Sequence, residues 1–319
     1  KSKMKIYKSL DDFPDIQKPV VTIGSFDGVH LGHQKILKRL KNIAKSINGE
    51  TVLVSFWPHP RMVLFPESHG IKLLYSFNEK VALLESFGID HLLSIPFTME
   101  FSKMESKDFI EKILVEKIKT KKLVIGYDHR FGRGREGSFA HLHAEQGRYN
   151  FELEEIPRKD IDNIGISSTK IRKALETGNI VLANEFLGRP YNLQGEVIEG
   201  DKIGRTIGFP TANIKLEEKN KLVPMDGAYI VRVLIEDKAY EGMLNIGIRP
   251  TISGERRNIE VNILDFDQAI YGKIINMELL AFLRPEKKFE NLNALKKQLN
   301  IDQEQVVDFF SATNKKSND

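Results

Sequence analysis

The sequence contains no cysteine. Disulfide bridges, thiolate nucleophiles, cysteine-based zinc sites and iron–sulfur clusters are therefore excluded, and the composition fits a reducing compartment such as the cytoplasm. No apolar run approaches the roughly 18 residues that a membrane-spanning helix needs, so we expect no such helix. The first residues include several lysines but no apolar core, so we expect no secretory signal there.

The numbers of positively and negatively charged residues are nearly equal. Lys and Arg number 48 and Asp and Glu 44 among 319 residues, which leaves a formal net charge of +4. This small excess does not by itself indicate nucleic-acid binding and fits anionic small molecules equally well. With 41% hydrophobic residues, the composition is that of a globular protein, and the length suggests about two domains.

The first half of the chain alternates short apolar runs with helical patterns. Val20–Ile23 predicts a buried strand, and a single apolar stripe predicts a helix from about Gly32 to Lys45. We expect Asn78 and Ser106 to cap two further helices. Further strands are expected at Thr51–Phe56, His91–Ile95, Leu123–Gly126 and Phe151–Ile156. Five strands separated by helices predict a doubly wound parallel sheet, which binds ligands beyond the carboxyl ends of its strands.

The pattern changes at Gly188. From there, short alternating segments are separated by Gly, Pro, Asn and Asp, which predicts an antiparallel barrel or sandwich. The segments are Gln194–Ile198, Ala228–Ile235, Tyr240–Ile246, Ile259–Phe266 and Lys273–Phe282. A helix is expected over Leu292–Phe310. We therefore expect an α/β domain over residues 1–187 and an antiparallel β-barrel domain with terminal helices over residues 188–319.

The first chemical motif extends from Gly24 to His33, where the first strand passes into the first helix. Glycines there let the backbone approach a ligand closely, and the N–H groups of a helix start favour phosphate. His30 and His33, three residues apart, can donate hydrogen bonds to a triphosphate. Taken alone, the pair could also lie on the surface, cap the helix or bind a metal, although no third ligand is nearby. The strand–turn–helix context favours phosphate binding.

This motif resembles the nucleotidyltransferase signature, and more closely the adenylyltransferase half of bacterial bifunctional riboflavin kinase/FAD synthetases. The resemblance implies that His30 and His33 are catalytic. Nucleotide-site residues in the same string are Gly24, Phe26, Asp27, Gly28 and Gly32. Three later segments match the family in order: Phe56–Arg61, Gly126–Gly132 and Ile166–Arg172. The resemblance implies that Arg172 is catalytic. It also implies that these segments contribute further nucleotide-site residues, namely Arg61, Asp128, Ser167, Ser168 and Thr169. His129 departs from the aromatic residue usual in the second segment.

The residues of these segments support the same chemistry, but each also has a structural alternative. Hydroxyls at a helix start, with Arg172 four residues beyond Ser168, would converge on phosphate oxygens. Alternatively, Ser168 caps the helix and Arg172 is solvated, Arg61 lies on the surface, and Asp128 caps a turn. All these segments are expected on one edge of the sheet, which favours a shared site.

The second motif is the glycine-rich segment Gly200–Asn213. It lacks the Gly-Lys-Ser/Thr of a Walker A loop, yet backbone amides near Gly204 and Gly208 can form an anion nest. The Thr211 hydroxyl and the Asn213 carbonyl are hard oxygen ligands that suit Mg²⁺ bound to phosphate. The alternative is an ordinary β-turn in which Asn213 satisfies its own backbone.

This segment and several others occur in the order found in riboflavin kinases, which they resemble. The other segments are Gly188–Tyr191, Asn245–Thr251, Glu260–Phe266 and Tyr271-Gly272. In that family the glutamate at Glu260 is the base on the riboflavin 5′-hydroxyl, although spacing alone also allows an outward strand residue. Asn262 stands where many relatives carry histidine. Arg284 matches a family segment and could contact flavin or close the barrel.

Together, the resemblance covers roughly Val20–Phe310 and implies two reactions with Mg²⁺ as cofactor. ATP would phosphorylate riboflavin to FMN in the C-terminal domain, and a second ATP would adenylylate FMN to FAD in the N-terminal domain. The expected partners are riboflavin, FMN and ATP, with neither nucleic acid nor membrane.

Three alternative functions remain open at this point. The N-terminal half could transfer nucleotides to another substrate, although the kinase half would supply FMN to it. The chain could be a non-catalytic flavin or nucleotide sensor, although both sets of phosphate-binding residues are intact. RNA binding has only the charge of +4 and the basic residues Arg130, Arg133 and Arg135 to support it.

Overall fold

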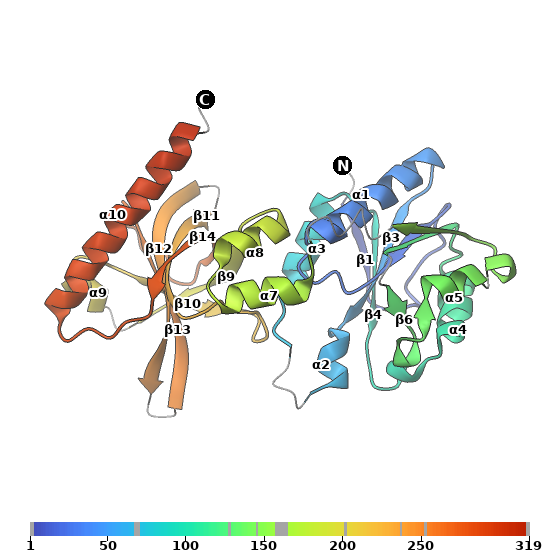
Figure 1. Cartoon of the computed structure of the whole chain (residues 1–319), viewed down its shortest axis with the longest axis horizontal. Helices are drawn as coiled ribbons and strands as arrows, with labels where there is room; N and C mark the ends of the chain where they lie inside the picture. The colour runs from blue at the N-terminus through green and yellow to red at the C-terminus, as the bar shows by residue number, and fades with distance from the viewer. Residues whose placement is uncertain are drawn as a thin grey trace. The chain divides into compact units, whose positions relative to one another are not determined.

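The computed structural model describes residues 3–66, 71–126, 129–144, 146–156, 165–200, 203–236, 238–251 and 254–316. Contacts within the chain divide it into two compact units, Lys1–Ser168 and Thr169–Asp319 (Figure 1).

The first unit is built on a six-stranded parallel sheet. Its strands, in spatial order, are β1 (Lys5–Tyr7), β4 (His91–Pro96), β3 (Thr51–Trp57), β2 (Val20–Ile23), β5 (Lys122–Gly126) and β8 (Glu152–Ile156). From β2 the chain winds outward to β3 and β4, and later to β5 and β8 on the other side. This order confirms the doubly wound fold and places its reversal point between the carboxyl ends of β2 and β5.

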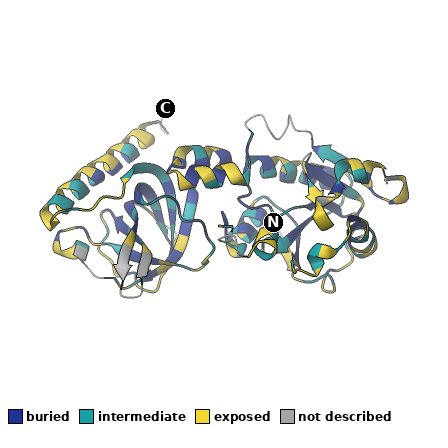
Figure 2. Ribbon diagram, turned by 60° about the horizontal axis from the view of Figure 1, so that its bottom comes forward, coloured by how far each residue is buried: buried dark blue, intermediate teal, exposed yellow. Residues whose placement is uncertain are grey.

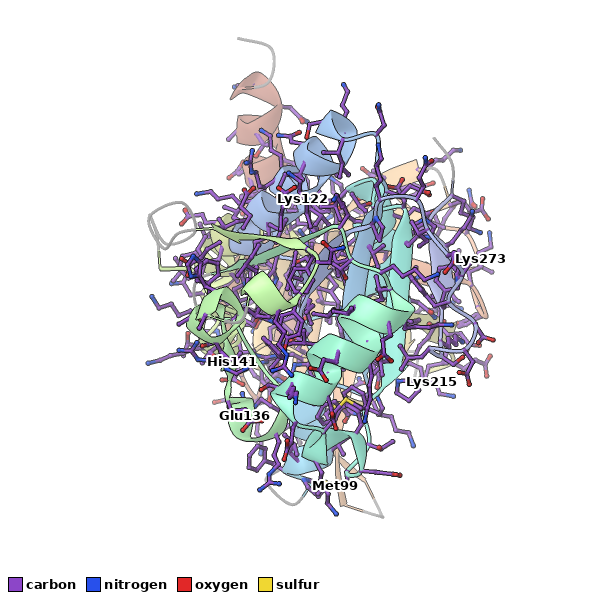
Figure 3. The ribbon with its side chains drawn as sticks, turned by 90° about the vertical axis from the view of Figure 1, so that its right-hand side faces the viewer. Met99, Lys122, Glu136, His141, Lys215 and Lys273 are labelled. Carbon is purple, nitrogen blue, oxygen red and sulfur yellow. The ribbon has the colours of Figure 1, made fainter. Side chains whose placement is uncertain are left out.

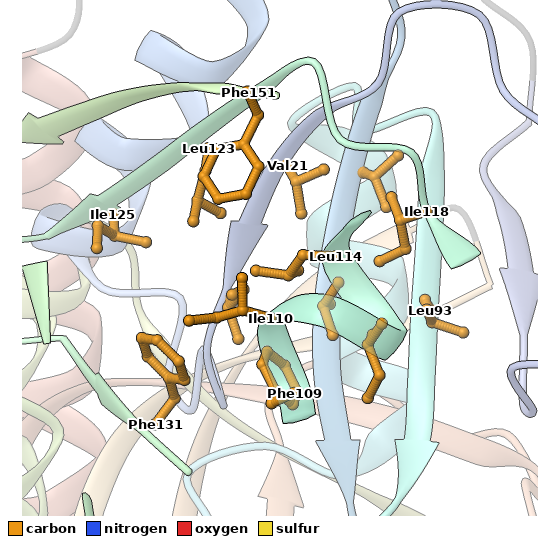
Figure 4. Packing of buried hydrophobic residues seen from close by; sticks show 14 of the residues in the cluster. Val21, Leu93, Phe109, Ile110, Leu114, Ile118, Leu123, Ile125, Phe131 and Phe151 are labelled. Carbon is orange, nitrogen blue, oxygen red and sulfur yellow. The ribbon is translucent and has the colours of Figure 1, made fainter. Parts of the chain in front are cut away.

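Helices cover both faces of this sheet because successive strand residues point to opposite sides. On one face, the π-helix η2 (Phe109–Lys117) packs Phe109, Ile110 and Leu114 against strand residues that include Val21 and Leu123 (Figure 4). On the other face, α1 (Leu31–Ser46) and α3 (Phe77–Ser86) cover a second cluster. The strand residues of that cluster are Val20, Leu53, Leu92 and Val124.

The start of α3 differs from the sequence-based expectation. The prediction of Asn78 as its cap is wrong, because Ser76 is the cap. The Ser76 hydroxyl accepts from Glu79 N at 3.2 Å, and the Glu79 carboxylate accepts from Ser76 N at 2.7 Å, which forms a capping box. The helix expected from Ser106 is present as α4 (Ser106–Asp108) followed directly by η2, but Ser106 is its first residue rather than its cap.

Smaller elements complete the first unit. They are α2 (Pro60–Leu64), η1 (Phe101–Lys103), β6 (Arg130–Phe131), η3 (Arg133–Arg135), β7 (Gly137–Ser138), α5 (Phe139–Ala144) and η4 (Gln146–Arg148). The β6–β7 hairpin packs on the start of α4, where Ser106 N donates to the Glu136 carboxylate at 3.0 Å. Figure 3 labels Glu136, which precedes β7, and His141, which belongs to α5.

The second unit contains a closed antiparallel barrel, which confirms the barrel expectation. Around the barrel the strands are β10 (Ala212–Leu216), β13 (Gly254–Ile263), β12 (Lys238–Thr251), β11 (Gly227–Ile235), β14 (Ile274–Pro285) and β9 (Tyr191–Ile198), which pairs back with β10. β10 was not expected from the sequence.

Helices flank the barrel. They are α7 (Ser168–Glu176), α8 (Ile180–Leu187), α9 (Ile203–Thr206) and α10 (Leu292–Lys316). The α7–α8 pair is bonded to barrel segments, since Met225 N donates to Leu175 O at 3.0 Å and Asn184 Nδ2 to Leu279 O at 2.8 Å. The inner side of α10 packs Val306 and other apolar residues against the barrel, and its outer side is exposed (Figure 2).

Candidate functional sites

The loop between β2 and α1 lies at the reversal point of the parallel sheet. It is bonded to β3 at its start, where Gly24 N donates to Val54 O at 3.0 Å. Three of its residues have positive φ: Phe26 (49°), Gly28 (88°) and Val29 (38°). Phenylalanine and valine rarely adopt this conformation, so the loop carries backbone strain that its surroundings must compensate.

The loop brings the two predicted histidines together on the first turn of α1. His30 caps the helix, since its Nδ1 accepts a hydrogen bond from His33 N at 3.4 Å. The two rings stack with centroids 3.7 Å apart, and the Phe26 ring lies 4.8 Å from that of His33. Gly32 is buried in the same turn. The N–H groups and the dipole of a helix start favour an anion at this place.

Asp27 and Ser168 also meet here, from opposite ends of the first unit. The Ser168 hydroxyl donates to the Asp27 carbonyl at 2.8 Å, and the buried Asp27 carboxylate accepts from Leu74 N at 3.1 Å. Both residues therefore hold the loop in place. Ser167 directly precedes Ser168, whereas Thr169 and Arg172 belong to the part of α7 assigned to the second unit.

The other predicted residues of the first unit lie elsewhere or are not described. Arg61 is exposed in α2, where its backbone N–H donates to His59 Nδ1 at 3.2 Å. Asp128 lies outside the described residues. The ring of His129 stacks on Phe131 with centroids 5.7 Å apart, so the histidine retains aromatic packing at the position where the sequence departs from the family pattern.

Sequence reasoning missed Lys80 of α3, whose side chain is 5% exposed. Its Nζ donates to Ser55 Oγ at 3.0 Å and to Ser25 O at 3.4 Å. Burial lowers the pKa of Lys80 to about 8, and the charge of nearby Asp27 partly opposes this shift. The sequence signal that could have found Lys80 is its spacing of four residues from Leu84, because residues four apart lie on the same face of a helix and Leu84 is buried.

A cavity of about 280 Å³ lies in the barrel unit and is lined by Gly204, Phe209 and Thr211 of the second motif, together with Glu260. Glu260 pairs with Asn213 across β10–β13 and with Asn245 across β12–β13. Directly paired residues of neighbouring strands share one face. The Glu260 carboxylate accepts from Asn258 Nδ2 at 2.6 Å and from Thr211 Oγ1 at 3.4 Å. Thr211, Asn213 and Glu260 therefore lie close together in the barrel.

Glycines shape the segment before β10. A side chain at Gly204 would lie 2.1 Å from the Phe209 carbonyl oxygen, and one at Gly200 would lie 2.0 Å from Asn213 Nδ2. Gly208 has a φ of 89°. The lack of a side chain lets Gly200 lie against Asn213 of β10 and lets Gly204 lie against Phe209 within the segment.

The barrel group is chemically suited to a hard cation that nucleotide phosphates also bind. Thr211 supplies a hydroxyl, Asn213 an amide oxygen and Glu260 a carboxylate. Asn262 Nδ2 donates to Pro210 O at 2.7 Å and so secures the residue before Thr211. Within the described ranges, no cluster of three or more histidine, aspartate or glutamate residues could hold a metal alone. A divalent cation bound here would share its coordination between these side chains, water and phosphate oxygens.

Arg284 forms one wall of the cavity and joins β14 to α10. Its guanidinium pairs with the buried Asp302 carboxylate at 2.7 Å, and Gln298 Nε2 donates to the same carboxylate at 2.9 Å. Beside it, burial raises the pKa of Glu286, although a hydrogen bond from Asn245 acts in the opposite direction. Sequence reasoning missed both Asp302 and Glu286.

The chain is similar to known proteins over most of its length. The family model for FAD synthetase matches residues 13–170, and that for riboflavin kinase matches residues 187–310. A protein of Escherichia coli K12 named bifunctional riboflavin kinase/FMN adenylyltransferase is 37% identical over 295 residues, 92% of this chain and 93% of the relative. A protein of the same name from Haemophilus influenzae is 38% identical over 298 residues, 93% and 96% of the two chains.

A solved structure shares the fold over both units. A crystal structure from Streptococcus pneumoniae, named a macrolide-efflux protein, aligns with a TM-score of 0.86 at 30% identity and covers 95% of this chain and 98% of its own. Every helix in the described part of the chain is too short or too polar to cross a bilayer.

Proposed function

Because the chain belongs to the family of bifunctional riboflavin kinases/FMN adenylyltransferases, we propose that it converts riboflavin to FAD in two ATP-dependent steps. We assign adenylylation to residues 1–187 and phosphorylation to residues 188–319. The observation that supports this division is the presence of two separate groups, His30 with His33 on α1 and Thr211 with Glu260 in the barrel.

In the phosphorylation step, the riboflavin 5′-hydroxyl attacks the γ-phosphorus of ATP. A new O–P bond forms, the bond from the γ-phosphorus to the ADP oxygen breaks, and the hydroxyl proton passes to the Glu260 carboxylate. Asn258 holds Oε1 of this carboxylate at 2.6 Å and so orients it. Thr211 and Asn213 would hold Mg²⁺, which supplies charge neutralisation on the phosphates when bound.

In the adenylylation step, a phosphate oxygen of FMN attacks the α-phosphorus of a second ATP. The bond to pyrophosphate breaks as the new O–P bond forms. The FMN phosphate is already anionic at pH 7, so the step needs no protein nucleophile and the lack of cysteine is no obstacle. His30, His33 and the start of α1 stabilise the negative charge of the triphosphate. The Ser168 hydroxyl holds the β2–α1 loop through its hydrogen bond to the Asp27 carbonyl.

We further propose Mg²⁺ as the metal and the cytoplasm as the compartment. The hard oxygen donors Thr211 and Asn213 support the first proposal, and the cysteine-free composition is compatible with the second. Neither a sensor function nor transfer to another substrate is favoured by a particular observation.

A chromatographic time course of riboflavin with ATP and MgCl₂ tests the proposal. We expect FMN first and FAD later, with both steps stopped by EDTA. FMN without FAD would contradict the adenylyltransferase assignment. Neither product, from folded protein, would contradict both assignments and support a sensor.

A further inference from the structure

Lys80 is a buried cation that the mechanism above does not use. Its side chain is 5% exposed, and its ammonium lies 5.5 Å from the Trp57 ring centroid and 5.8 Å from that of Phe77. Its hydrogen bonds go to Ser55 Oγ on β3, at 3.0 Å, and to Ser25 O in the β2–α1 loop, at 3.4 Å. The side chain thus joins α3 to the carboxyl ends of two central strands.

If this position served only stability, a lysine would be a costly choice of residue. Removing an ammonium from water is unfavourable unless hydrogen bonds and an opposite charge compensate, and an apolar side chain often fills such a space at lower cost. The compensating groups here include Ser25 O and the charge of Asp27, both in the strained loop that precedes His30. Lys80 therefore links the loop that forms the histidine site, through Ser25 O and the charge of Asp27, to β3, through Ser55.

The β2–α1 loop is held from several sides. The Lys80 ammonium donates to the Ser25 carbonyl of the loop. Leu74 N donates to the Asp27 carboxylate at 3.1 Å, and the Ser168 hydroxyl donates to the Asp27 carbonyl at 2.8 Å. Leu74 and Lys80 both belong to the segment around the start of α3. These contacts compensate the positive φ angles of Phe26 and Val29.

We propose that Lys80 is a positioning residue for the adenylylation site. Its ammonium holds the loop in the conformation that presents His30, His33 and the N–H groups of α1 to the triphosphate. The role in adenylylation rests on the proposed function. The effect of Lys80 on the conformation of the β2–α1 loop is a property of the free protein and can be measured without substrate.

The test uses the full-length chain with Lys80→Met, Lys80→Arg and a matched control, Leu84→Ala. The control removes a fully buried side chain from the same helix without removing a charge. Hydrogen exchange of the peptide covering residues 24–33 is measured without ligand. We expect Lys80→Met to speed exchange there by about tenfold, Lys80→Arg to restore most of the protection, and Leu84→Ala to lack this loop-specific effect.

Activity gives a second readout. In Lys80→Met we expect kcat for FAD formation from FMN to fall at least about tenfold, while riboflavin phosphorylation stays within about twofold. The pKa of Lys80 is lowered to about 8, so its cationic form is lost as pH rises through that value. Adenylylation should therefore decline above pH 8 in the parent chain, and Lys80→Arg should remove this decline.

The surroundings of the ammonium define that pH dependence. Asp27 faces it from the β2–α1 loop, while β3 contributes the neutral Ser55 and Trp57, and α3 contributes Phe77. Glu79 of α3 is engaged in the capping box with Ser76.

If Lys80→Met fails to fold, Ser55→Ala removes one partner of the ammonium and keeps its charge; we then expect a smaller change in the same loop. Unchanged loop exchange in the substituted chain would overturn the proposal, and so would equal loss of both activities. If the unsubstituted chain makes no FAD but Lys80→Met still exchanges faster in this loop, Lys80 positions the loop and the proposed function is contradicted instead.

Discussion

The hydroxyl of Ser168 donates a hydrogen bond to the backbone carbonyl of Asp27 at 2.8 Å, although 141 residues separate them in the chain. This bond joins the start of α7 to the loop that carries the histidine site. Ser168 thus acts on the loop geometry from the far end of the first unit.

Ser168→Ala should slow FAD formation. Loss of one such hydrogen bond costs about 1 kcal/mol, which corresponds to roughly a fivefold decrease in kcat. Steady-state kinetics with FMN and ATP measure this. The matched control is Ser86→Ala, which removes a similar hydroxyl-to-carbonyl bond, to Leu83 O, on the exposed side of α3. An equal loss in the control would contradict a role for Ser168 at the site.

His33→Ala should depress adenylylation and leave phosphorylation largely intact. The side chain stacks on His30 at the start of α1, and loss of one preorganised donor to developing charge costs about 100- to 1,000-fold in kcat. The two rates are measured separately, with FMN and with riboflavin as substrates. His141→Ala on α5 is the control. Equal loss of both activities in folded His33→Ala would contradict the assignment of two sites.

Glu260→Gln should depress riboflavin phosphorylation and leave adenylylation largely intact. Without its carboxylate the barrel lacks the base for the 5′-hydroxyl, so riboflavin phosphorylation should fall about 100- to 10,000-fold. FAD formation from added FMN should persist. Glu278→Gln on β14, which removes a carboxylate that pairs with Arg232, is the matched control and should keep both activities. Retained phosphorylation in Glu260→Gln would exclude it as the base.

Asn213→Ala should weaken the metal dependence of phosphorylation. Loss of one oxygen donor should raise the MgCl₂ concentration needed for half-maximal rate by at least about tenfold. A titration of MgCl₂ at saturating ATP measures this. An unchanged half-maximal concentration would place the metal elsewhere.

Asp302→Ala should destabilise the barrel unit by about 3–5 kcal/mol, because it leaves the guanidinium of Arg284 largely buried and without its carboxylate. Denaturant unfolding measures the loss. The double variant Arg284→Met with Asp302→Leu should recover much of the stability, since neither charge then remains. A double variant that is less stable than Asp302→Ala would contradict this explanation.

Much of the fold could be predicted because its signal is local. The run Val20–Ile23 and the apolar stripe of α1 correspond closely to the observed elements. The short β1 was missed because its three residues are ordered by pairing with β4, which is distant in sequence. Strand β10 was missed because the preceding glycines and proline indicate a turn, whereas pairing with β9 and β13 forms the strand.

The candidate sites could be predicted only in part for a similar reason. His30 and Glu260 belong to motifs with characteristic neighbours, so the sequence indicates their role. Lys80 and Asp302 are charged residues within helices, and such residues usually face solvent. Only the folded chain shows that Ser55 and Arg284 bind them in buried positions.

The central claim is that two separate sites in one chain carry out successive reactions, and mixing two variants tests it most directly. Glu260→Gln and His33→Ala, each folded, are incubated alone and in equal mixture with riboflavin, ATP and MgCl₂. The account predicts unconverted riboflavin from the first alone, FMN from the second alone, and FAD from the mixture. A mixture that accumulates FMN without forming FAD would contradict it.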